Sequence, residues 1–134
     1  MNKFLSSIAD VLEVDEVSLD TVFRETPGWC SLMAFGLLVT MENDWQAPVS
    51  VEELADMHTI RNLYRTAFAA FAAKLLGVTR ETALRESYGS IPEWDSVNHL
   101  RLVMESEARF GVSYALEIIP SLKTIEDFIT RAKQ

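Results

Sequence analysis

An internal repeat constrains this chain more than any other feature of its sequence. When residues 27–65 are placed over residues 92–130, a shift of 65 positions, Ser31 falls on Ser96 and the register holds without a gap. Eight positions are identical in the two segments, namely Pro27/Pro92, Trp29/Trp94, Ser31/Ser96, Leu37/Leu102, Glu42/Glu107, Glu52/Glu117, Thr59/Thr124 and Ile60/Ile125. We therefore predict two domains, residues 1–65 and 66–134, each a copy of one small unit.

The pattern of apolar and capping residues predicts that both copies are helical. Apolar side chains recur at helical spacing over residues 2–13, 31–43 and 96–109, and no segment alternates as a strand does. A short helical turn is expected over residues 115–119. Three further helix starts are marked by capping residues, which are Ser50 with Glu53, Thr59 with Asn62, and Thr124 with Asp127.

The connections between the helices complete the predicted fold. Neither proline nor glycine interrupts residues 59–76, so one continuous helix is predicted to join the two copies. A long connection precedes each serine, over residues 15–28 and 79–94, and we expect Trp29 and Trp94 to anchor these connections in the core. The predicted fold class is all-α, with two consecutive four-helix bundles.

The composition excludes several classes of function. No apolar run approaches the roughly 20 residues of a membrane span, and Asp10 and Glu13 interrupt the apolar N-terminal segment, so we expect a cytoplasmic protein. The net charge of −8 argues against nucleic acid as a partner, because such a partner requires a basic face. Cys30 is the only cysteine, which excludes an internal disulfide and a Cys/His zinc cluster, and we expect it to be half-buried.

Ser31 and Ser96 each lie at the predicted start of a helix. The N–H groups and the macrodipole of a helix N-terminus favour a phosphate attached there. Asp95 is a good N-cap for the Ser96 helix, whereas Cys30 is a poor one for the Ser31 helix. A serine at this position can also be nothing more than a cap. No histidine recurs in both copies as a base, so a Ser-His-Asp nucleophile is not supported and an enzyme is not expected.

The segment around Ser96 carries an extended motif. It reads Trp94-Asp95-Ser96-Val97, followed by Leu100-Arg101-Leu102-Val103-Met104-Glu105-Ser106-Glu107 and Phe110-Gly111-Val112. This run resembles the Asp-Ser-Leu signature and second helix of acyl carrier proteins, and the predicted helix order of each copy is similar to that family almost throughout. The resemblance implies that Ser96 carries covalent 4′-phosphopantetheine and that Asp95 orients it. Ser31 is the corresponding residue in copy one, where the aspartate is missing.

The resemblance also implies a function and a docking face. In acyl carrier proteins the cofactor thiol holds an acyl or aminoacyl group as a thioester and delivers it to separate enzymes, as in lipid or polyketide biosynthesis. The implied partners are a phosphopantetheinyl transferase and acyl-loading and acyl-transferring enzymes, which bind the exposed face of the second helix. On this chain that face comprises Val97, Leu100, Arg101 and Met104 in copy two, and Leu32, Phe35 and Val39 in copy one.

Two alternatives to a tandem carrier remain open from the sequence. In the first, only Ser96 carries the cofactor, and copy one is an unmodified docking module. In the second, the chain is a non-modified helical adaptor. Both serines are then helix caps, and the almost wholly apolar helix over residues 31–43 binds another protein.

Overall fold

The computed structural model describes residues 2–133, and this part of the chain is all-α, as predicted. Its β-pairing is limited to two isolated bridges, Val22 with Thr59 and Ser113 with Lys133. None of the helices in this part is long and apolar enough to cross a membrane. Contacts divide the chain into two compact units, Lys3–Ala67 and a second that comprises the residues from Phe68 onward together with Asn2. Their interpretation as two copies of one carrier bundle stays a prediction.

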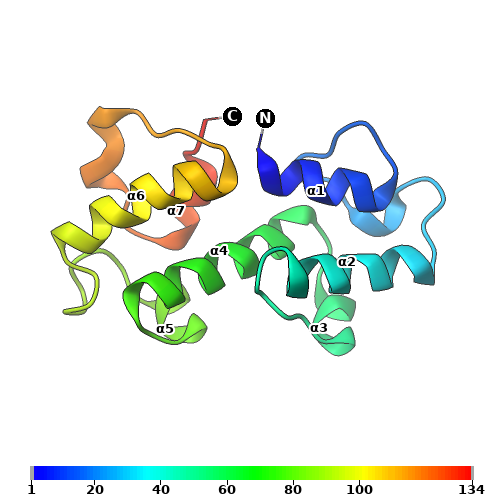
Figure 1. Ribbon diagram of the computed structural model, residues 1–134, viewed down its shortest axis with the longest axis horizontal. Helices are drawn as coiled ribbons and strands as arrows, with labels where there is room; N and C mark the ends of the chain where they lie inside the picture. Colours follow the sequence, from blue (N-terminus) through cyan, green and yellow to red (C-terminus); the bar gives the residue numbers. More distant parts are fainter. Residues whose placement is uncertain (1, 134) are drawn as a thin grey trace. The chain divides into compact units, whose positions relative to one another are not determined.

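The first unit is built around helices α1 and α2. Its elements are α1 (Lys3–Leu12), the 3₁₀ helix η1 (Phe23–Glu25), α2 (Ser31–Asn43), α3 (Val51–Asp56) and the beginning of α4 (Ile60–Leu76). The buried ring of Phe4 lies edge-on to Trp45 and Tyr64, with centroids 5.1 and 5.0 Å away. Gly36 lets α1 and α2 pack closely, since a Cβ there would lie 3.0 Å from Val11 Cγ1. Figure 1 shows the two helices side by side, in blue and cyan.

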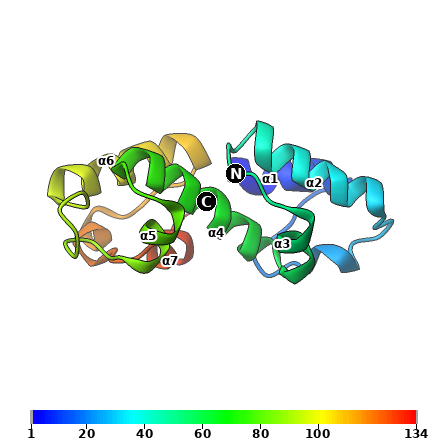
Figure 2. The same cartoon turned by 90° about the horizontal axis from the view of Figure 1, so that it is seen from below.

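The second unit contains the remaining helices around a cluster of phenylalanines. Its elements are the end of α4, α5 (Arg80–Arg85), α6 (Ser96–Phe110), the 3₁₀ helix η2 (Leu116–Ser121) and α7 (Ile125–Thr130), which can be followed in Figures 1 and 2. The Phe68 ring stacks on Phe110 with centroids 5.1 Å apart and lies 5.5 Å from Phe128. All three rings are fully buried, so they tie α4, α6 and α7 into one core.

The predicted helix starts are confirmed by their capping hydrogen bonds. In α3, the Glu53 backbone N–H donates to Ser50 Oγ and the Ser50 N–H donates to Glu53 Oε1, each at 3.0 Å. In α7, Thr124 and Asp127 form the equivalent capping box. α4 is a single helix, as expected from the absence of proline and glycine, and it ends at Leu76, directly before Gly77, whose φ of 73° is left-handed.

The prediction of a connection over residues 79–94 is partly wrong, because this segment contains the short helix α5. Thr79 is the missed start signal: its Oγ1 accepts a hydrogen bond from the Thr82 N–H at 3.1 Å. Ala83 then fixes the helix by full burial. The turn expected over residues 115–119 is a 3₁₀ helix that extends to Ser121 and includes Pro120.

Local hydrogen bonds recur in the two units at the 65-residue spacing. The Phe23 N–H donates to the His58 carbonyl at 3.3 Å, and the Tyr88 N–H donates to the Lys123 carbonyl at 2.8 Å. Asn62 Oδ1 accepts from the backbone N–H groups of residues 58 and 59, as the Asp127 carboxylate accepts from those of residues 123 and 124. The sequence repeat therefore corresponds to a repeat in local structure.

Candidate functional site

Ser96 is the first residue of α6, and its side chain is exposed. The preceding Asp95 has an extended backbone and caps the helix, because its Oδ1 accepts from the Asn98 N–H at 2.9 Å. This bond satisfies one of the N–H groups that a helix start leaves unpaired. The helix therefore begins at one defined residue, and the Ser96 hydroxyl lies on its first turn facing solvent.

Asn98 adds a second bond between the first turn of α6 and the segment before it. Its side-chain Nδ2 donates to the Glu93 carbonyl at 2.8 Å, while its Oδ1 accepts from Arg101 Nη1 at 3.0 Å. Together with the cap on Asp95, these bonds hold residues 93–95 against the helix from two sides. Sequence reasoning missed Asn98, because its bond to the Glu93 carbonyl forms only when the loop is folded against the helix.

Trp94 and His99 form a buried pair beneath the exposed serine. Trp94 is fully buried, as predicted for an anchor, and its indole Nε1–H donates to His99 Nδ1 at 3.0 Å. His99 Nε2 lies 2.9 Å from the Ile119 carbonyl oxygen, and the imidazole stacks on Tyr88 with centroids 3.9 Å apart. Burial lowers the pKa of His99; the Ile119 carbonyl acts in the opposite direction, and the charge of Lys123 lowers the pKa further.

In this arrangement both ring nitrogens of His99 contact groups inside the protein, so the residue has a structural role. A sequence signal for this role existed. Position 99 lies on the same helix face as the buried residues 102, 103, 106 and 110, so it is a polar residue on an otherwise largely apolar stripe. The other polar member, Ser106, donates to the Val103 carbonyl of its own helix at 3.0 Å.

The residues predicted as a docking face lie exposed along α6. Val97, Leu100 and Met104 have 65%, 53% and 67% of their surface exposed. Arg101 is also exposed, and its Nε lies 3.7 Å from Glu105 Oε2, one turn later. The strip is thus apolar with a locally neutralised charge.

Ser31 occupies the equivalent place at the start of α2, and it too is exposed. Its cap is weaker, since the side chain of Cys30 makes no capping hydrogen bond. Cys30 is exposed, so the expectation of a half-buried residue was wrong; it lies in the extended segment just outside the helix. Trp29 is half-buried and its ring lies 5.6 Å from that of Phe23.

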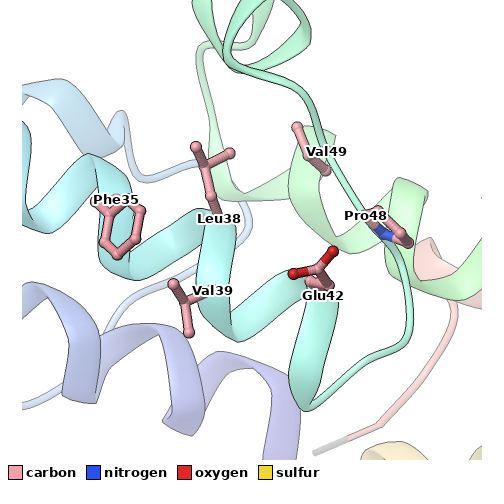
Figure 3. A pocket seen from close by; sticks show the side chains of 6 residues that line it. All are labelled: Phe35, Leu38, Val39, Glu42, Pro48 and Val49. Carbon is pink, nitrogen blue, oxygen red and sulfur yellow. The ribbon is translucent and has the colours of Figure 1, made fainter.

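The outer face of α2 is more apolar than that of α6. Leu32 and Phe35 are 77% and 63% exposed, and Val39 is exposed as well. Beside them lies a surface hollow of about 160 Å³, shown in Figure 3, which is lined by Phe35, Leu38, Val39, Glu42, Pro48 and Val49. Leu38 is half-buried, and its side chain lines this hollow.

The exposed side chains that could be modified covalently at these two sites include the hydroxyl groups of Ser31 and Ser96 and the thiol of Cys30. Within residues 2–133, no three His, Cys, Asp or Glu side chains gather into a group that could hold a metal ion. The sequence matches no protein-family model, no curated protein and no solved structure.

Proposed function

We propose that this protein is an acyl carrier, in which Ser96 bears a covalent 4′-phosphopantetheine group. The observation that carries the proposal is the exposed Ser96 hydroxyl on the first turn of a helix whose start is fixed by Asp95. A phosphodiester at this position meets the positive end of the α6 dipole, which stabilises its negative charge. The residues present therefore fit the group.

The chain's own residues supply attachment and presentation. When bound, the cofactor supplies a thiol that holds an acyl or aminoacyl group as a thioester. Asp95 and Asn98 hold the segment before Ser96 in place, so that a phosphopantetheinyl transferase meets a preformed site. The apolar strip of Val97, Leu100 and Met104 then offers a surface to acyl-loading and acyl-transferring enzymes in the cytoplasm.

Ser31 is proposed as a second, poorer attachment site. It shares the exposed position at a helix start but has no side-chain cap. Two arms on one chain would raise the local concentration of loaded groups at a bound enzyme.

Cofactor loading tests the proposal directly. The protein is incubated with coenzyme A and a broad-specificity phosphopantetheinyl transferase, and its intact mass and modified peptides are measured. We expect one addition that maps to Ser96 and disappears in Ser96→Ala, with a slower second addition that disappears in Ser31→Ala. One addition only, on Ser96, would indicate a single carrier beside a docking module. No addition to a folded protein, with a known carrier loaded in parallel, would contradict the proposal.

The exposed apolar face of α2 favours a second candidate function, that of a non-modified helical adaptor. Leu32, Phe35 and Val39 form an unpartnered strip beside the hollow of Figure 3, which is typical of a surface that binds another protein. The two functions differ in their dependence on Ser96. In a reconstituted pathway, Ser96→Ala should abolish the activity of a carrier and leave that of an adaptor unchanged.

A further inference from the structure

A single imidazole joins four segments of the second unit. His99, 2% exposed, lies in the first turns of α6, where its Nδ1 meets the Trp94 indole at 3.0 Å. Its Nε2 lies 2.9 Å from the Ile119 carbonyl of η2. Its ring stacks nearly parallel on Tyr88, at an interplanar angle of 5°, and lies edge-on to Phe128 of α7, 5.6 Å away.

These partners determine which ring nitrogen of His99 carries the proton. An indole N–H can only donate, so His99 Nδ1 must be the acceptor and carries no hydrogen. A carbonyl oxygen can only accept, so Nε2 must carry the hydrogen. Both contacts require the same neutral tautomer, with the proton on Nε2.

Protonation of His99 is incompatible with this arrangement. A proton on Nδ1 would face the Trp94 N–H across 3.0 Å, which places two donors against each other in a buried site. No carboxylate among the described contacts of the ring offsets the charge. The ionisable groups that face it are the Tyr88 hydroxyphenyl ring and Lys123, whose ammonium lies 5.3 Å from the Tyr88 ring centroid.

We propose that neutral His99 is the positioning residue of the Ser96 site, and that its protonation releases Trp94 and with it the segment before Ser96. Trp94 directly precedes the cap Asp95, so freeing its indole loosens the backbone that sets the helix start. The consequence for cofactor attachment rests on the proposed function, whereas the pH-dependent release does not. Ala34 occupies the equivalent position of the first unit, so Ser31 has no such control.

Nitrogen-detected NMR of the full chain tests the release. The chain provides a control for each observed side chain. His58, which is exposed, is the control histidine. Trp45 is the control tryptophan, because its indole N–H donates at 3.0 Å to Ser7 Oγ, a hydroxyl group that does not titrate in this range. We expect the Nε2–H tautomer at neutral pH and a Trp94 indole signal that changes with the same midpoint as His99, while the Trp45 signal stays constant. A Trp94 signal that is unchanged while His99 titrates would overturn the proposal.

Two variants separate the release from a general loss of packing. His99→Asn keeps a side-chain acceptor near Nδ1 but cannot titrate, so the pH step in the Trp94 signal should disappear. Trp94→Phe keeps His99 and removes the opposing donor, so the pKa of His99 should rise. An unchanged or lower pKa of His99 in Trp94→Phe would contradict the role of the Trp94 bond, even if His99→Asn does not fold.

Cofactor loading then connects the release to Ser96. Ser96 loading is measured in the wild-type protein and in His99→Asn, from neutral to mildly acidic pH. Taking the ratio of wild type to variant at each pH cancels the pH dependence of the transferase itself. The neutral fraction of His99 falls about tenfold per pH unit below its pKa, and the ratio should fall with it. A constant ratio would overturn the positioning role. If neither the wild-type protein nor His99→Asn is loaded at any pH, the proposed function is contradicted. The NMR titration alone then tests whether protonation of His99 releases Trp94.

Discussion

In both serine segments an extended residue leads into a helix, but the two helix starts are held by different means. In the second unit, polar side chains at positions 95, 98 and 99 bind the segment before Ser96, through hydrogen bonds to backbone groups and to Trp94. The equivalent residues of the first unit are Cys30, Met33 and Ala34, none of which has a polar group that replaces these bonds. Met33 is buried instead, and its Cε lies 3.6 Å from where a Cβ of Gly28 would be.

This difference indicates which of the two segments is held in a single conformation. Hydrogen bonds are directional, so a network of them specifies one arrangement, whereas apolar packing tolerates several. A polar network also depends on the charge state of its members, and burial lowers the pKa of one of them, His99, below its usual value. We therefore expect the Ser96 site to be better defined and more sensitive to pH than the Ser31 site.

The largest contrast should appear when the two equivalent tryptophans are truncated. Trp94→Ala removes a fully buried side chain and should destabilise the second unit by about 3–5 kcal/mol. Trp29→Ala removes a half-buried one and should cost the first unit roughly 1–3 kcal/mol. Native-state hydrogen exchange measures the two units separately, through amides of α6 and α2. Equal losses would mean that the segments are anchored to the same extent.

The next contrast is in the pH dependence of stability. The folded second unit has a lowered pKa for His99, so between the unfolded value of 6.5 and that lower pKa the unfolded chain binds a proton that the folded unit does not. The free energy of unfolding should therefore decrease as the pH falls through this range, by up to about 1.4 kcal/mol per pH unit. Hydrogen-exchange rates of α6 amides, compared between the wild-type protein and His99→Asn, provide the measurement. A slope that persists in His99→Asn must come from other groups.

The smallest contrast concerns the helix caps. Asp95→Ala should cost about 1 kcal/mol, because the Asn98 N–H loses its acceptor. Cys30→Asp adds the missing cap to α2 and should stabilise the first unit by a similar amount. In the loading assay, Cys30→Asp should also speed modification of Ser31, and Asp95→Ala should slow that of Ser96. If neither rate of modification changes, the helix cap has no role in cofactor attachment.

Much of the local structure was open to prediction, because the signals and their partners lie within one turn of helix. The starts of α2 at Ser31 and α6 at Ser96 were predicted correctly, as were the caps at Ser50 and Thr124. α5 was missed although Thr79 signals it, because a helix of six residues shows too little periodicity to stand out from a loop.

The sequence by itself determined the helical class, the continuous α4 and the two serines at helix starts, since each depends on residues close together along the chain. Only the tertiary structure decided how the Ser96 segment is held. His99 is 5 residues from Trp94 and 20 from Ile119, so its two hydrogen bonds form only when the loop, α6 and η2 pack together. Spacing along the chain does not encode such contacts, because burial and the directions of the side chains select them.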